Sequence, residues 1–227
     1  MKMKLSEVVP FGRSLDEYRH MFALSRQDLD KTILGVADGP ASFNAELFAQ
    51  GKRVVSLDPL YQFEGEEIKK QFDRVADDVF GQVASRPQDY VWAYHKNLQV
   101  LRETRTRVID LFVTDFARGK AEGRYIYAQL PVLEFRNQQF GLALCSHFLF
   151  LYSSLFSYEF HLQSVLEMLR VGNELRIFPL LRLDGQESPY LTPLIKELDS
   201  RGFHCRLEKV AYEMQKGGNT MLKITKT

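Results

Sequence analysis

The stretch "ILGVADGPASFNAEL", residues 33–47, decides the fold of this 227-residue chain. A short apolar run ends in the turn 37–41, and an amphipathic segment follows it. This pattern predicts a buried strand that stops at a tight turn and leads directly into a helix. Turns of this kind often bind nucleotide-like ligands, because small residues let the backbone approach the ligand. Ala37, Gly39 and Ala41 are the small residues of this turn.

Short apolar or β-branched runs alternate with helical segments along most of the chain. Strands are expected at residues 32–37, 53–57, 124–127, 141–146 and 174–180, and helices at 43–49 and 162–169. Such alternation predicts a parallel sheet that is covered on both faces. From Phe203 onward the chain reads as strand, Gly-rich turn at 216–219 and strand. We therefore expect an α/β, Rossmann-like, doubly wound and mostly parallel seven-stranded sheet that ends in an antiparallel hairpin.

Two segments lie outside this alternation. Residues 61–123 are helical in character and too long for a single crossover, so they predict a helical insertion between the second and third strands. We expect this insertion to cap the carboxyl edge of the sheet. Residues 1–31 are expected to form an N-terminal helical arm, and residues 1–227 a single domain.

Composition excludes several classes of protein. Hydrophobic residues make up 45% and charged residues 26% of the chain, and the net charge of +1 is not that of a protein that coats polyanions. Cys145 and Cys205 lie far apart, and no histidine spacing is typical of a metal site, so neither a disulfide framework nor a metal is predicted. The most apolar stretch, residues 140–156, is too short and too polar for a membrane span. We expect a soluble, cytoplasmic protein.

An acidic residue follows the second expected strand. Asp58 lies nineteen positions after Gly39, where two neighbouring parallel strands end. Ligands of open α/β sheets bind outside the carboxyl ends of the strands. A carboxylate there can accept hydrogen bonds from both hydroxyls of a ribose. Gly39 and Asp58 together therefore predict an adenosine-containing ligand.

These features resemble the class I S-adenosylmethionine-dependent methyltransferases, with a core like that of the type 11 group. "ILGVADGPAS" is similar to that family's first motif and "VVSLDP" to its ribose-binding second motif. "AQLPVLEFRNQQFGLALCSHFLFLY" and "EMLRVGNELRIF" resemble the later segments, and the closing hairpin resembles the family's antiparallel seventh strand. The resemblance covers residues 32–58 and 124–227, and leaves the arm and the insertion outside it.

The resemblance implies S-adenosylmethionine as cofactor and a methyl transfer to an unidentified acceptor, with a small molecule favoured. The residues that it implies for cofactor binding are Ala37, Asp38, Gly39, Pro40, Ala41, Asp58, Pro59, Gln129, Leu130, Cys145 and Ser146. His147 follows the fourth expected strand and is the candidate base that would assist the acceptor. Aromatic and polar residues of the arm, the insertion and the following loop are candidates for substrate binding: Tyr18, Tyr94, His95 and Tyr152.

The chain also departs from the family pattern. Gly35 stands where the family has an acidic residue, Ala37 and Ala41 replace glycines, Gln129 lies near a position that is often acidic, and Gly141 replaces an aspartate. These departures leave open a non-catalytic descendant that binds S-adenosylmethionine or another protein. A degraded dinucleotide fingerprint leaves open an NAD(P)-dependent oxidoreductase. A basic stretch near residue 105 reads as a solvated helix face, and a nucleic acid partner is not favoured.

Overall fold

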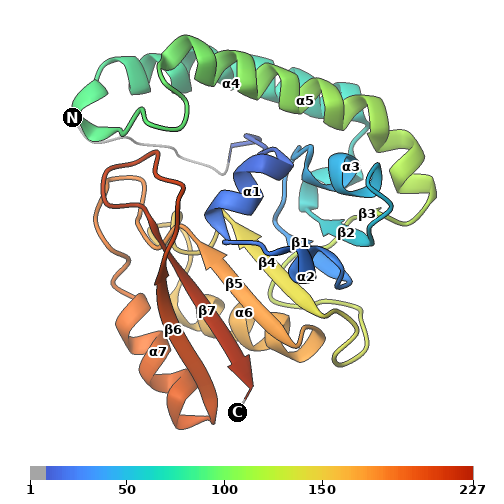
Figure 1. Cartoon of the computed structure of the whole chain (residues 1–227), viewed down its shortest axis with the longest axis vertical. Coiled ribbons are helices and arrows are strands. Elements are labelled where there is room, and N and C mark those ends of the chain that lie inside the picture. The colour runs from blue at the N-terminus through green and yellow to red at the C-terminus, as the bar shows by residue number, and fades with distance from the viewer. Residues whose placement is uncertain (1–8, 227) are drawn as a thin grey trace.

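A computed structural model describes residues 9–226 of the chain, and within them one seven-stranded sheet forms the centre of the fold (Figure 1). The strand order is β3-β2-β1-β4-β5-β7-β6, and β7 runs antiparallel to both of its neighbours while the other pairs are parallel. The strands are β1 (Ile33–Val36), β2 (Val54–Leu57), β3 (Tyr125–Ile126), β4 (Leu142–Ser146), β5 (Glu174–Phe178), β6 (Phe203–Lys209) and β7 (Thr220–Lys226). This architecture confirms the predicted fold class.

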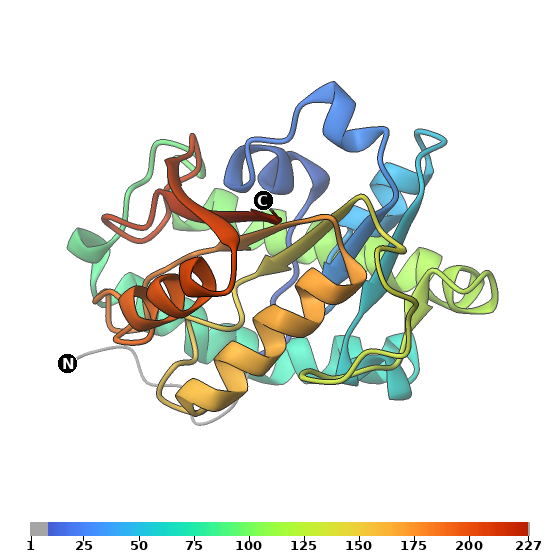
Figure 2. The same ribbon diagram turned by 90° about the horizontal axis from the view of Figure 1, so that it is seen from below.

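Helices cover both faces of the sheet (Figures 1 and 2). The helices of the structure are α1 (Leu15–Met21), α2 (Arg26–Leu29), α3 (Phe43–Phe48), α4 (Gly65–Ala84), α5 (Leu98–Ala121), α6 (Tyr158–Val171) and α7 (Leu191–Ser200), with short 3₁₀ turns at η1 (Pro59–Gln62) and η2 (Pro87–Asp89). Side chains alternate across β1, so Leu34 and Val36 pack with α6 and α7 while Ile33 packs with α1 and α3. The run "ILGV" is apolar throughout because both of its faces are buried.

The final hairpin differs from the prediction in one respect. The glycine turn forms, since the amide of Gly218 donates to the carbonyl of Gln215 at 2.8 Å, but β6 ends at Lys209, well before this turn, while β7 begins at Thr220, directly after it. Residues 211–218 leave the sheet, and Tyr212 within this segment is only 1% exposed. Its ring lies 5.9 Å from that of Phe178 at the end of β5. The long connection therefore brings Tyr212 to the carboxyl end of β5, which a tight turn would not do.

The insertion forms two long helices, α4 and α5, that lie side by side (Figure 1). Asn97 begins α5 by accepting a hydrogen bond at 2.9 Å from the amide of Val100. The facing sides of the two helices share an aromatic core that includes Phe72 and Phe112. None of the helices within residues 9–226 is both long enough and apolar enough to cross a membrane.

Candidate functional site

The turn after β1 folds in the left-handed backbone region. Ala37 has a φ of 55° and Gly39 a φ of 53°, and only the second of these residues adopts such a conformation without strain. The carbonyl of Gly39 accepts a hydrogen bond at 2.7 Å from the hydroxyl of Tyr61, which holds the turn against η1. Ala37 therefore adopts this conformation at an energetic cost. Strained backbone conformations of this kind occur most often at functional sites.

The segment 9–13 lies directly on this turn. A Cβ atom on Gly12 would come within 2.1 Å of the carbonyl oxygen of Pro40, so only glycine fits at this point of contact. Phe11 and Arg13, on either side of Gly12, therefore reach the space beside the turn.

Asp38 explains the unusual glycine in β1. Its carboxylate accepts hydrogen bonds at 2.6 Å from the hydroxyls of both Tyr18 and Ser56. A Cβ atom on Gly35 would lie 1.9 Å from Oδ2 of Asp38, so Gly35 leaves the room that this carboxylate fills. Burial raises the pKa of Asp38 to about 7, the charge of Asp58 adds to the rise, and the two hydroxyls limit it. Asp38, three residues after Gly35, thus supplies the acidic side chain that β1 lacks.

Asp58 ends β2 and faces the same turn. Its Oδ2 accepts from the amide of Gly39 at 2.8 Å, and its Oδ1 accepts from the amide of Leu60 at 2.8 Å. Each oxygen keeps a second lone pair, and the residue is 8% exposed. Burial raises the pKa of Asp58 to about 6, although the two amides lower it in part. At neutral pH this side chain is therefore mostly an anion that can still accept hydrogen bonds.

These residues line one cavity of about 420 Å³ at the carboxyl ends of β1, β2 and β4. Nine of the residues predicted for the site line it: Ala37, Asp38, Gly39, Asp58, Pro59, Gln129, Leu130, Ser146 and His147. Three others do not: Pro40, Ala41 and Cys145. Ala41 packs in the core beside α1, and Cys145 is fully buried with a pKa that burial raises to about 12.

Sequence reasoning missed an aromatic wall of this cavity. Phe148, Phe156 and Phe160 line it from the loop after β4 and the first turn of α6. The rings of Phe156 and Phe160 are stacked, with centroids 4.6 Å apart and planes 17° apart. Their sequence signal is the aromatic density of residues 148–160, which also fits an ordinary core.

His147 lies at the border of this cavity and a second one. Its φ of 50° turns the chain away from β4, and its amide donates to the carbonyl of Phe178 at 2.6 Å. Its Nδ1 lies 2.9 Å from the hydroxyl of Ser146. Burial holds the pKa of His147 well below its usual value, and the nearby charges of Arg13 and Arg105 lower it further. The imidazole is therefore neutral at physiological pH and, because its protonated form is disfavoured here, is a weak base.

The second cavity, of about 150 Å³, lies between the α4–α5 pair and the carboxyl ends of β4 and β5. Tyr152 lines it, is 2% exposed and accepts a hydrogen bond at 3.3 Å from the amide of Val9. The position of Tyr152 is thus compatible with its predicted role toward a substrate.

The other residues predicted for substrate binding lie outside both cavities. Tyr18 is fully buried, stacks on Phe43 at 4.0 Å and positions Asp38. Tyr94 donates from its hydroxyl to Asp16 at 2.5 Å, while His95 is 1% exposed. None of these three side chains is placed where it would contact a ligand in either cavity.

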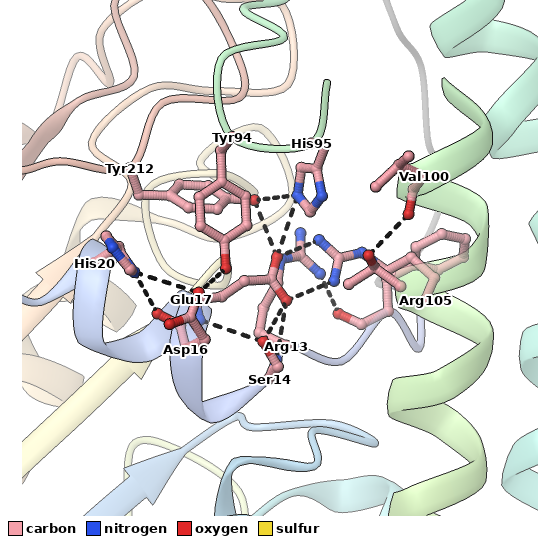
Figure 3. A network of polar contacts seen from close by, with 12 residues as sticks. Arg13, Ser14, Asp16, Glu17, His20, Tyr94, His95, Val100, Arg105 and Tyr212 are labelled. Atoms are coloured by element: carbon pink, nitrogen blue, oxygen red, sulfur yellow. Dashed lines mark hydrogen bonds and ion pairs between the residues drawn. The ribbon is translucent and has the colours of Figure 1, made fainter. Parts of the chain in front are cut away.

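A buried polar cluster is centred on Glu17 of α1 (Figure 3), and its members Arg105 and Tyr212 also line the second cavity. Arg105 of α5 donates to both carboxylate oxygens of Glu17, at 2.8 and 2.5 Å. Three further partners surround the carboxylate: Ser14, His95 and Tyr212. Burial alone would raise the pKa of Glu17, but the charge of Arg105 and its hydrogen bonds hold that pKa well below its usual value. This cluster joins the arm, the insertion and the hairpin.

The strand order and the antiparallel β7 are those of the class I S-adenosylmethionine-dependent methyltransferase fold. A similar solved structure is that of the PH0226 protein from Pyrococcus horikoshii, with 11% identity and a TM-score of 0.51 over 94% of this chain and 89% of that one. Magnesium protoporphyrin IX methyltransferase of Synechocystis, solved with bound SAH, matches with 13% identity and a TM-score of 0.47 over 94% and 82%. The first of these distant likenesses describes the fold alone, and the second carries no argument.

A relative with clear sequence similarity defines the family. The uncharacterized protein MJ0045 of Methanocaldococcus jannaschii is 35% identical over 226 residues, which are 98% of this chain and 98% of that protein. The chain therefore belongs to the same family as this archaeal protein. No protein-family model matches the chain.

Proposed function

We propose that this protein binds S-adenosylmethionine in the 420 Å³ cavity and transfers its methyl group to a small-molecule acceptor. The observation that carries the proposal is the carboxylate of Asp58, which faces the Gly39 turn with one lone pair on each oxygen that is not used within residues 9–226. It can accept the hydroxyls of a ribose from this position. The cavity volume lies within the ~300–1,000 Å³ that small-molecule and cofactor sites usually have.

The fit extends to the other walls. A Cβ atom on Gly39 would point toward Oδ2 of Asp58, 4.0 Å away, so glycine keeps open the space beside that carboxylate. Leu60 and Leu130 offer apolar surface for an adenine ring, and Gln129 offers an amide that can bond its edge. The segment 9–13 covers the turn and would exclude water from the bound cofactor.

Methyl transfer depends more on the positioning of the two reactants than on a dedicated catalytic group. S-adenosylmethionine, when bound, supplies an electrophilic methyl group. The protein must hold an acceptor nucleophile in line with it in a dry site. His147 borders both cavities, and its neutral imidazole can take the proton that a hydroxyl or amine acceptor loses.

The alternative of an NAD(P)-dependent oxidoreductase finds less support in the sheet. Dinucleotide-binding sheets of the classic type continue in the parallel order 3-2-1-4-5-6. Here an antiparallel β7 lies between β5 and β6. NAD therefore serves as the negative control ligand.

Calorimetric titration with S-adenosylmethionine, S-adenosylhomocysteine and NAD tests the proposal, on the unaltered protein and on Asp58→Asn. We expect micromolar binding of the first two ligands, and a loss of about 10- to 100-fold in the variant, because hydrogen bonds to a charged group disappear. Asp73→Asn changes an exposed carboxylate of α4 and should leave binding unchanged. If the unaltered protein binds neither sulfur ligand, the proposal is wrong and a non-catalytic interaction protein becomes the better interpretation.

A further inference from the structure

The acceptor has its own candidate site, and this inference rests on the proposed function above. The 150 Å³ cavity shares four lining residues with the cofactor cavity: Val9, Phe11, Arg13 and His147. A molecule in the smaller cavity would therefore lie next to the bound cofactor, across His147. Apolar cavities of about this volume hold a group the size of a benzene ring.

The walls of this smaller cavity are apolar and aromatic, but their charged side chains are all cationic. Phe80 of α4, Phe178 of β5 and Met214 of the hairpin loop are typical of the lining. Arg13 and Arg105 also line it, and none of the described residues that line it is an aspartate or glutamate. Buried guanidinium groups need negative partners, because transfer of an unpaired charge from water is costly.

Only one of these two cations is compensated by the part of the chain that the structure describes. Glu17 binds Arg105 through both oxygens, and its nearest approach to Arg13 is 3.9 Å, to Nε. That Nε is buried and has no hydrogen-bond partner among residues 9–226. Nη1 of Arg13 donates to uncharged backbone oxygens, those of Phe11 at 2.6 Å and Gly12 at 3.2 Å. Two guanidinium groups thus share one carboxylate, and one positive charge is left over.

The neighbouring titratable groups do not remove this excess. His95 is 1% exposed, and burial lowers its pKa, so it contributes no negative charge and stays neutral. The phenol of Tyr212 has a raised pKa because of burial and the charge of Glu17, so it is not ionised either. Burial and the charge of Arg105 both lower the pKa of Arg13, and Glu17, 3.9 Å from its Nε, raises that pKa only in part.

We infer that the methyl acceptor is a hydroxy- or amino-substituted carboxylic acid, about one aromatic ring in size, whose carboxylate pairs with Arg13 in the 150 Å³ cavity. Its hydroxyl or amine would form the new bond to the methyl carbon as the bond from that carbon to the sulfonium sulfur breaks, S-adenosylhomocysteine would leave, and the acceptor's proton would pass by way of His147 to water. The guanidinium has the geometry for a carboxylate, since its N–H groups form a planar fork. The aromatic walls take the apolar part of the molecule, and His147 lies between that part and the cofactor cavity.

Benzoate is the probe for this inference, and benzamide is its uncharged counterpart of the same shape. Ligand-observed NMR titrations would measure the binding of both to the protein, with and without saturating S-adenosylhomocysteine. We expect benzoate to bind about 10- to 100-fold more tightly than benzamide, because only benzoate has a charged group that forms charge-assisted hydrogen bonds with Arg13. Arg13→Gln should abolish this preference and Arg13→Lys should retain part of it. Arg107→Gln, which removes an exposed arginine of α5, should leave it unchanged.

The outcomes separate this inference from the proposed function. Equal binding of benzoate and benzamide, or an unchanged preference in Arg13→Gln, would overturn the inference while the cofactor proposal stands. If Arg13→Gln weakens S-adenosylhomocysteine binding at least tenfold and benzoate binds only without that ligand, Arg13 holds the carboxylate of the cofactor, and the inference is wrong. If S-adenosylhomocysteine fails to bind but the preference for benzoate depends on Arg13, the anion site stands and the methyl transfer is refuted.

Discussion

Two consecutive residues of α1, Glu17 and Tyr18, are anchored in two polar clusters of opposite electrostatic character. Tyr18 donates to Asp38 in the turn after β1, where hydroxyls and amides surround the carboxylates. Glu17 binds the guanidinium of Arg105 directly. Both carboxylates are almost fully buried, yet burial raises the pKa of Asp38 to about 7, while Arg105 holds that of Glu17 well below its usual value.

The comparison shows that charge compensation, and not burial alone, decides what a buried carboxylate does. The cluster around Glu17 is a structural joint between three segments of the chain. Its carboxylate is closely paired with Arg105, and Arg13 is not closely paired. The cluster around Asp38 is under-compensated, as is typical of ligand sites, where perturbed pKa values accumulate. Variants that remove the charge compensation in the Glu17 cluster, or fill the space beside Asp38, test this difference.

The largest effect is expected from Glu17→Gln. This change leaves the buried Arg105 and the half-buried Arg13 with no carboxylate between them among residues 9–226. Removal of one partner of a buried ion pair destabilises a protein by about 3–5 kcal/mol. Urea denaturation should show that loss in the free energy of unfolding, and Glu66→Gln on the exposed face of α4 should show almost none. A loss below about 1 kcal/mol would mean that the cluster is not the joint described above.

The next effect concerns the space beside Asp38. In Gly35→Ala the new methyl group would lie 1.9 Å from Oδ2 of that carboxylate, so the turn after β1 must move. Overpacking of this kind destabilises by about 1–3 kcal/mol.

Gly81→Ala is the matched control for this prediction. Gly81 is an exposed glycine inside α4, and a Cβ atom added to it would meet no other atom within 4 Å among the described residues. Alanine there should stabilise the protein by about 0.5–1 kcal/mol, since it restricts the unfolded chain and favours the helix. Thermal unfolding of the two variants should therefore shift in opposite directions. A neutral Gly35→Ala would contradict the close contact with Asp38.

The turn and the sheet could be predicted because their signals are local in the sequence. The run at β1, the turn residue Gly39 and the carboxylate of Asp58 lie within one strand–helix–strand unit, and the structure places both residues at the predicted cavity. The substitution of Gly35 was harder to interpret, because its reason is the side chain of Asp38 and becomes visible only in three dimensions.

The second cluster could not be predicted because its contacts are distant in the sequence. Glu17 meets Arg105 across 88 positions and Tyr212 across 195. The local pattern around Arg105 is that of a solvated helix face, and the pattern around Tyr212 is that of a strand. Tertiary packing overrides both of these ordinary local patterns. The candidate acceptor cavity has part of its wall in the same three segments, so it was equally hidden.

The last effect is a dependence on pH that should distinguish the two carboxylates. Because the folded-state pKa of Asp38 is raised to about 7, the folded protein retains a proton that the unfolded chain has released above pH ~4. The unfolded state then binds fewer protons, so the free energy of unfolding falls as the pH rises from ~4 toward 7, by at most about 1.4 kcal/mol per pH unit. Asp38→Asn removes this titration, and its stability relative to the unaltered protein should increase across that window. Glu17 acts with the opposite sign, since its contribution is lost only as the pH falls below its unfolded value. Denaturant titrations of the unaltered protein and of Asp38→Asn from pH 5 to pH 8 would measure this difference in the free energy of unfolding. Parallel curves would contradict the prediction. They would show that Asp38 is already ionised at pH 5 and is compensated by a group other than its two hydroxyl donors.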